Sequence, residues 1–239
     1  MSHPYCIWTT QRSGGTTLST ILASMTEFPV LQDEPFLLNR VLGAVYNHYW
    51  IEGNQIFTRF ENNIFSKNVV FKHCFNGADR LDFEFDLYDF LKAKNYKHIY
   101  LYRKEKVNEY LSLALARESS IWSYRNKSGY DKNQTYTVDL KQFGILISRL
   151  ERNRTRMLDE ILIDKKDVIK IAFEDLYDAN SCELNKFWFN LFGFLKFDSD
   201  LINIFEVDKV LSETNQKSRD YIERIVNLDD VIKLITNLT

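Results

Sequence analysis

The amino-acid sequence predicts an α/β fold in three layers, with a central parallel sheet of about five strands and helices on both faces. Two observations support this prediction. Short apolar runs alternate with longer segments in which apolar residues recur every three or four positions. The 239 residues are 45% hydrophobic and 27% charged, which is typical of a globular chain and excludes a disordered or collagen-like one. Because no repeat or linker-like tract interrupts the sequence, we expect residues 1–239 to form a single domain.

The predicted strands are short runs rich in β-branched or aromatic residues, each followed by polar residues. They span residues 5–9, 30–31, 69–71, 99–102 and 168–173, of which 30–31 is the weakest. Helical periodicity separates them in residues 18–25, 107–119 and 140–161. The last of these is the longest amphipathic segment, and its stripe includes Arg154 among apolar residues. Strands that alternate with helices in this way predict parallel pairing.

Charge and cysteine content exclude several classes of protein. The 31 Lys and Arg residues nearly balance the 33 Asp and Glu residues, whereas a general nucleic-acid binder carries a basic excess. Cys6, Cys74 and Cys182 lie far apart, so neither a disulfide framework nor a zinc site is predicted. The sequence has no signal-peptide pattern and no apolar run long enough to cross a bilayer. We therefore expect a soluble, cytoplasmic protein with no membrane span, no metal and no nucleic-acid partner.

The polar loop TQRSGGTT, residues 10–17, follows the first predicted strand and precedes a predicted helix. A glycine-containing turn at this position aims backbone N–H groups and the positive end of a helix dipole at one point, where an anion can bind. The ATP-binding P-loop needs a Lys directly after its second Gly, but here Thr16 follows Gly15. A plain turn with Ser and Thr caps is the alternative. The predicted anion-binding residues are Arg12, Ser13, Gly14, Gly15, Thr16 and Thr17.

The stretch TQRSGGTTL resembles the 5′-phosphosulfate loop of sulfotransferases that use 3′-phosphoadenosine 5′-phosphosulfate (PAPS), and the bacterial trehalose-sulfotransferase branch resembles it most. Gly15 differs, because that branch usually has Ser there. The resemblance implies a P-loop-like fold, PAPS as co-substrate, and a role for Arg12 at the reaction centre as well as in binding.

A second stretch matches the motif with which this family binds the 3′-phosphate. Arg103 closes the predicted strand 99–102, and Ser112 follows nine positions later on a predicted helix. A guanidinium fork and a hydroxyl on a rigid helix suit a dianionic phosphate. Taken alone, Arg103 is an ordinary arginine at a strand end and Ser112 an ordinary helix-face serine. The segment 172–176 resembles a strand-to-helix junction of the family and is interpreted as structural capping.

Three further residues are candidates for the reaction itself. The resemblance assigns Glu34, in the stretch QDEPF, to the acceptor hydroxyl as its base, although an acid at a helix N-terminus is the alternative. Lys72 is expected near the sulfonate. His73 is a weaker candidate base, because the family's His comes one residue later and adjacent strand residues point in opposite directions.

The resemblance thus predicts a sulfotransferase that moves a sulfuryl group from PAPS to a hydroxyl of a small-molecule acceptor, without a Mg²⁺ requirement. A carbohydrate acceptor is implied by the branch alone. The alternatives are a non-catalytic module that binds a nucleotide or anion, and a P-loop nucleotide kinase. The loop 125–137, with Arg125 and Lys127, could approach the 3′-phosphate, and a homodimer is left open.

Overall fold

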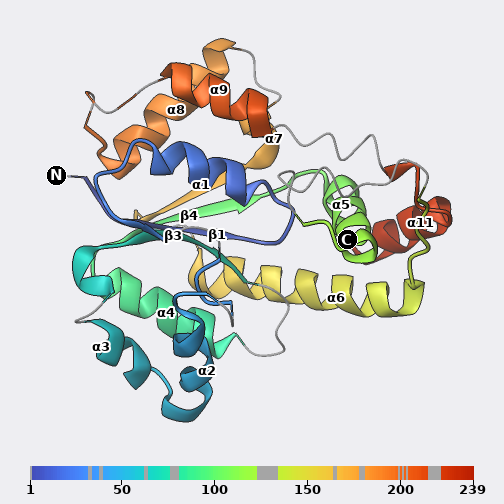
Figure 1. Cartoon of the computed structure of the whole chain (residues 1–239), viewed down its shortest axis with the longest axis horizontal. Coiled ribbons are helices and arrows are strands. Elements are labelled where there is room, and N and C mark those ends of the chain that lie inside the picture. The colour runs from blue at the N-terminus through green and yellow to red at the C-terminus, as the bar shows by residue number, and fades with distance from the viewer. Residues whose placement is uncertain are drawn as a thin grey trace.

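The computed structural model shows a five-stranded parallel sheet between two layers of helices (Figure 1). The residues that it describes are 2–31, 34–37, 40–61, 64–75, 81–122, 134–163, 166–177, 181–198, 200, 202, 204–214 and 222–239. The strands are β1 (Tyr5–Thr9), β2 (Val30–Leu31), β3 (Val70–Cys74), β4 (Lys97–Tyr102) and β5 (Val168–Ala172). They lie in the order β2-β3-β1-β4-β5, with every neighbouring pair parallel. The predicted three-layer α/β fold is confirmed.

Helices cover the two faces of the sheet unequally (Figure 1). One face carries α1 (Gly15–Ala23), α8 (Ser181–Leu195) and α9 (Ile204–Thr214). The other carries α2 (Gly43–Glu52), α3 (Gln55–Glu61), α4 (Asp82–Ala93) and α6 (Leu140–Arg156). Two helices, α5 (Lys106–Ser119) and α11 (Leu228–Leu238), lie beyond the strand ends. The short helical turns are η1 (Phe65–Lys67), the π-helical η3 (Met157–Ile161) and α7 (Phe173–Tyr177).

The central strand β1 explains how the layers are held together. Its side chains alternate between the two cores: Ile7 packs in the cluster shared with α1 and α8, and Trp8 in the cluster shared with α4. All five residues of β1 are buried. A strand covered on both faces must be apolar on both, which is why this run shows no polar alternation.

Several predicted boundaries differ from the observed ones, and three of them bear on the site or on the longest helix. Strand β3 begins at Val70 and continues beyond the predicted apolar run 69–71 to Cys74, so Lys72 and His73 lie within it. Strand β5 ends at Ala172, and Phe173 already begins α7. The predicted helix 140–161 is α6 as far as Arg156, followed by the turn η3.

The strand order makes the chain leave the carboxyl ends of β1 and β3 toward opposite faces of the sheet. The chain leaves β1 toward α1 on one face, and the next helix after β3, α4, covers the opposite face (Figure 1). Open α/β sheets bind ligands at the strand ends where the connections after neighbouring strands go to opposite faces of the sheet.

Among the helices that the structure describes, none has both the length and the apolar composition needed to cross a bilayer.

Candidate functional site

The loop after β1 turns sharply into α1 through left-handed backbone at two positions. Arg12 has a φ of 66°, and Gly14, the N-cap of α1, has a φ of 82°. The amides of Thr17 and Leu18 bond to the Gly14 carbonyl at 3.1 and 3.3 Å, which starts the helix. A Cβ on Gly14 would lie 2.3 Å from Cδ2 of Phe173, so both the conformation and the space require glycine.

Gly15 leaves room for the side chain of Lys72. A Cβ at position 15 would lie 2.8 Å from Lys72 Cδ and 2.9 Å from Thr9 Cγ2. A serine at this position would therefore collide with Lys72 as it lies here.

Lys72 connects the loop to Glu34. Its Nζ lies 3.4 Å from Thr16 Oγ1 and 3.5 Å from Glu34 Oε1, and the side chain is 9% exposed. The thiol of Cys74, two residues along the same strand face, donates to the same Glu34 oxygen at 3.0 Å. Burial raises the pKa of Cys74 well above its usual value, against the opposing effect of Lys72, so the thiol stays a donor. The predicted residues Thr16, Glu34 and Lys72 thus lie together.

His73 points away from this group. Its ring meets those of Trp8 and Phe36 edge-on, with centroids 5.4 Å apart in both pairs. Its Nε2 lies 3.8 Å from Glu84 Oε1 in the core beneath the sheet. Adjacent strand residues face opposite sides, so the structure brings Lys72 to the loop and turns His73 from it.

Arg12 joins the loop to helix α5. Its Nε donates to Ser112 Oγ at 2.9 Å, and its Nη1 donates to the Trp122 carbonyl at 2.9 Å. Ser112 is 3% exposed, so its hydroxyl is held in one place by the helix and by Arg12. The first and second predicted motifs therefore meet through one hydrogen bond.

Phe173 lies between the loop and the second predicted arginine. The Arg103 guanidinium stacks on its ring with Cζ 4.1 Å from the centroid, and the same ring closes the space above Gly14. Glu174 then accepts from the amides of Lys104 and Glu105 at 3.0 and 3.2 Å, where α5 begins. Segment 172–176 thus contacts the start of α5 through Glu174, and Phe173 also shapes the site.

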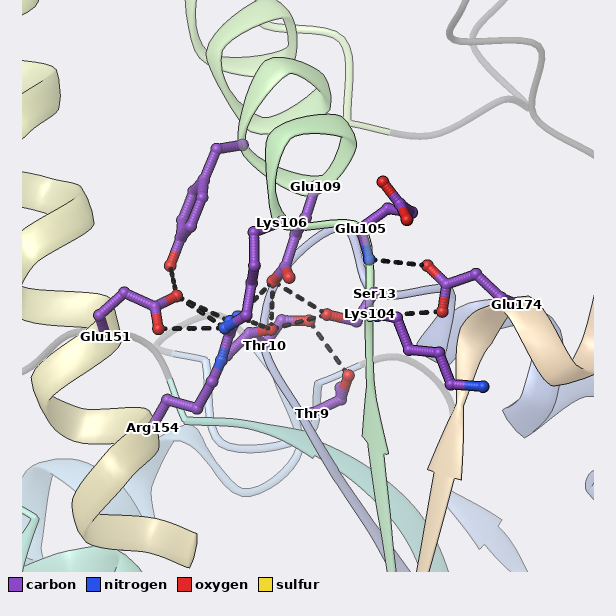
Figure 2. A network of polar contacts seen from close by, with 11 residues as sticks. Thr9, Thr10, Ser13, Lys104, Glu105, Lys106, Glu109, Glu151, Arg154 and Glu174 are labelled. Carbon is purple, nitrogen blue, oxygen red and sulfur yellow. Dashed lines mark hydrogen bonds and ion pairs between the residues drawn. The ribbon is translucent and has the colours of Figure 1, made fainter. Parts of the chain in front are cut away.

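A buried polar network supports the loop from below (Figure 2). Glu109 Oε1 accepts from Thr10 at 2.6 Å, from Ser13 at 3.2 Å and from Arg154 Nη2 at 2.6 Å. Arg154 also donates to Thr10 Oγ1 at 3.2 Å and pairs with Glu151 at 2.7 Å. Ser13, a predicted ligand, is fully buried, with its hydroxyl directed into this network.

Sequence reasoning missed Glu109 and Arg154 as parts of the site. Two signals could have found them. Glu109 lies three positions before Ser112 and therefore on the same helix face, and Arg154 is a charge within an otherwise apolar stripe. Burial raises the pKa of Glu109 to about 7, although the hydrogen bonds from Thr10 and Ser13 lower it.

The described part of the chain contains no group of three or more His, Cys, Asp or Glu side chains that could hold a metal ion. Some predicted residues cannot be located, because Gln32 and Asp33 beside Glu34, and Arg125 and Lys127 of the polar loop, lie outside the described residues.

Comparisons with known proteins give a likeness of fold only. No protein-family model and no curated protein matches the chain. Several solved structures do, and those named here are sulfotransferases. Mouse sulfotransferase SULT7A1, solved with PAP, is 15% identical with a TM-score of 0.44; the match covers 90% of this chain and 66% of that one. This chain thus spans less than two thirds of the mouse protein.

Two sulfotransferase domains give similar values. The domain of the Synechococcus PCC 7002 olefin synthase is 15% identical with a TM-score of 0.43, over 99% of this chain and 95% of the domain. The domain of the curacin biosynthetic pathway is 16% identical with a TM-score of 0.44, over 84% and 77%. At such values no role of a residue passes from these proteins to this chain.

Proposed function

We propose that the protein is a sulfotransferase that moves a sulfuryl group from PAPS to a hydroxyl of a small-molecule acceptor. One observation carries the proposal: separate predicted motifs converge on the loop after β1. Arg12 bonds the loop to Ser112, and Lys72 bridges Thr16 and Glu34. Parallel strands bring polar residues at their ends to one edge in any case, so the specific contacts between the motifs, and not their shared edge, support the proposal.

The arrangement suits an in-line displacement at sulfur. The acceptor oxygen forms a bond to sulfur while the bond from sulfur to the bridging oxygen breaks, and that electron pair passes to the 5′-phosphate of the leaving nucleotide. The helix N-terminus, Arg12 and Lys72 carry the positive charge that this growing negative charge needs. Removing one such donor is expected to lower turnover by about 10²–10³-fold.

Glu34 is proposed to take the proton of the acceptor hydroxyl. Lys72 Nζ and the Cys74 thiol both contact its Oε1, which fixes the position of the carboxylate. His73 does not enter this mechanism, because its ring lies in the core on the opposite face of β3.

Arg103 and Ser112 are proposed to bind the 3′-phosphate. A hydroxyl can accept one hydrogen bond and donate another, so Ser112 can accept from Arg12 and still donate to a phosphate oxygen. The Arg103 guanidinium is held over the Phe173 ring, with Cζ 4.1 Å from the centroid, and supplies the fork of N–H donors that a phosphate needs. The carbohydrate acceptor remains a proposal that depends on the branch resemblance alone.

A thermal-shift assay tests the proposal directly. With ligand at about 100 times its dissociation constant, adenosine 3′,5′-bisphosphate and PAPS are expected to raise the melting temperature by about 5–10 °C. ATP with Mg²⁺ is expected to leave it unchanged, and a shift with ATP–Mg²⁺ alone would favour the kinase alternative. If the nucleotides bind but no sulfo adduct appears by mass spectrometry across an acceptor library, the non-catalytic module is favoured.

Replacement of Arg103 separates the proposed phosphate sites. Arg103→Ala is expected to weaken the binding of adenosine 3′,5′-bisphosphate by about 10–100-fold, because a charged hydrogen-bonding partner is lost. Binding of adenosine 5′-phosphate should change by less than about threefold, since that ligand lacks the 3′-phosphate. Arg117→Ala, at an exposed position of α5, the helix that follows Arg103, is the control for titration calorimetry. Equal losses for both nucleotides would show that Arg103 does not contact the 3′-phosphate.

A further inference from the structure

We propose that Glu109 is a positioning residue of the nucleotide-binding loop, and that its proton binds cooperatively with a polyanionic nucleotide there. The inference rests on nucleotide binding at this loop, as proposed above. It assigns to α5 and α6 a function that the family resemblance does not address: they set the loop's shape and couple it to pH.

The geometry fixes the loop through one oxygen atom. Thr10, Ser13 and Arg154 all donate to Glu109 Oε1. The other carboxyl oxygen, Oε2, is buried and has no hydrogen-bond partner among the described residues. A full negative charge shared with an unpartnered buried oxygen is costly, so the carboxyl gains little from ionising.

The network also ties Glu109 to the phosphate-binding side of the site. Glu109 and Ser112 lie one helical turn apart on α5, and each contacts the loop, through Ser13 and Arg12. The loop therefore has two attachments to one rigid helix. Loss of the Glu109 attachment would leave Ser13 and its neighbouring glycines less restrained.

Charge provides the coupling. Burial is the main reason that the pKa of Glu109 is raised to about 7, and the Arg103 guanidinium is a smaller influence that lowers it. A phosphate bound at Arg103 offsets that positive charge, so Glu109 holds its proton more tightly when the nucleotide is bound. By linkage, the neutral carboxyl must favour the nucleotide to the same degree.

Other charged and titratable groups face Glu109 from each element packed around it. Arg154 and Glu151 come from α6, Tyr100 and Arg103 from the end of β4, and Tyr110 and Lys106 from α5 itself. With Glu109 ionised, the three cations Arg103, Lys106 and Arg154 exceed the two acids by one charge; with Glu109 neutral, the excess is two charges. This change in net charge takes place in the network that contacts the anion-binding loop.

Titration calorimetry of adenosine 3′,5′-bisphosphate in buffers of different ionisation enthalpy measures the coupled proton. Wild type is expected to take up about 0.3–0.5 proton more per nucleotide than Glu109→Gln at pH 7.5. The ratio of the two dissociation constants should change by about three- to tenfold between pH 6 and pH 8.5. The ligand's own phosphates titrate equally in both experiments, so their contribution cancels when wild type is compared with Glu109→Gln. Glu118→Gln, an exposed acid on the same helix, is the control and should match wild type. Equal proton uptake in wild type and Glu109→Gln would overturn the coupling.

Hydrogen exchange without nucleotide tests the positioning role separately. In Glu109→Ala, amides of residues 10–17 are expected to exchange about tenfold faster than in wild type, while those of β4 stay unchanged. Glu109→Gln keeps an acceptor oxygen for Thr10 and Ser13 and should remain near wild type, also if the Ala variant folds poorly. Unchanged loop exchange in both variants would overturn the positioning role. Faster exchange together with no nucleotide binding by wild type would instead refute the proposed function.

Discussion

Position 15 shows how one side chain limits the choice of another. The loop contains glycine there because the aliphatic part of Lys72 occupies the space that a Cβ would need. A buried lysine whose ammonium reaches Thr16 and Glu34 must pass over the loop closely. Lys72 can therefore reach Thr16 and Glu34 along this path only if residue 15 has no side chain.

Gly15→Ser is expected to displace Lys72 and to destabilise the protein by about 1–3 kcal/mol, because overpacking forces neighbouring groups to shift. Urea denaturation measures the loss. Gly193→Ser on α8, where a Cβ would meet nothing within 4 Å, is the matched control. Because Lys72 is the flexible neighbour, Gly15→Ser should cost less in a Lys72→Ala background. Additive effects would show that Thr9 alone causes the conflict.

Glu34→Gln is expected to reduce turnover by about 10²–10⁴-fold and leave adenosine 3′,5′-bisphosphate binding within about twofold, since only the proton acceptor is removed. Steady-state rates and titration calorimetry on the same preparation separate the two effects. Glu118→Gln serves again as the exposed acid control. Unchanged turnover would remove Glu34 as the base and leave it a structural partner of Lys72.

The candidate site was partly predictable from local sequence. The loop, Glu34, Lys72, Arg103 and Ser112 each stand at a strand end or on a helix that periodicity reveals, and parallel strands bring such positions to one edge. Their mutual contacts were not predictable. The bond between Arg12 and Ser112, for example, spans 100 positions and depends on the tilt of α5 against the loop.

At the scale of elements, α5 is held at its start by a carboxylate from another element. Glu174, on α7, accepts from the amides of Lys104 and Glu105. These N–H groups precede the first turn of α5, where a negative charge is favourable. The segment that follows β5 therefore determines where α5 begins, and with it the turn that carries Arg103.

Glu174→Ala is expected to lower the free energy of unfolding by about 0.5–2 kcal/mol, as loss of a helix cap does. The same substitution is expected to weaken the binding of nucleotides that carry a 3′-phosphate. Asp175→Asn removes only the exposed pair with Lys104 and should cost under about 1 kcal/mol. Chemical denaturation and calorimetry with both adenosine nucleotides provide the comparison. A loss of stability without any change in nucleotide preference would show that the cap does not set the position of Arg103.

Element boundaries illustrate where periodicity fails. Strand β1 is observed as predicted because both of its faces are apolar and polar residues follow at once. The prediction ended strand β3 too early because Lys72 and His73 are polar. In the structure both side chains are buried within the strand, Lys72 beside Glu34 and His73 beside Glu84. Buried polar residues with partners elsewhere in the fold resemble a loop in the sequence.

At the scale of the whole molecule, near-neutral charge conceals a concentration of ionisable groups at one place. The network under the loop draws on β1, α5 and α6, and the described residues that form it are widely separated in the chain (Figure 2). Acids and bases that meet in the interior shift each other's pKa values, so the stability of the fold becomes dependent on pH.

The pH dependence of unfolding should show the sign that a raised acid pKa requires. Between the unfolded value of 4.5 and the folded value of about 7, native Glu109 binds more protons than the unfolded chain. Its stabilising contribution is therefore complete below pH 4.5 and is lost as the pH rises through 7. Burial also raises the pKa of Glu151, so this group likewise stabilises the fold less as the pH rises. The lowered pKa of His3, a partly buried residue, acts in the opposite direction.

Wild type is thus expected to lose about 2 kcal/mol of unfolding free energy between pH 5 and pH 8 that Glu109→Gln does not lose. Urea denaturation at half-unit pH intervals measures both curves, and Glu118→Gln should follow wild type. The difference between wild type and Glu109→Gln isolates one group from every other titration in the chain. A constant difference over this range would mean that Arg154 keeps Glu109 ionised throughout. The loop would then lie against a fixed ion pair, and its anion affinity would carry no pH dependence from this network.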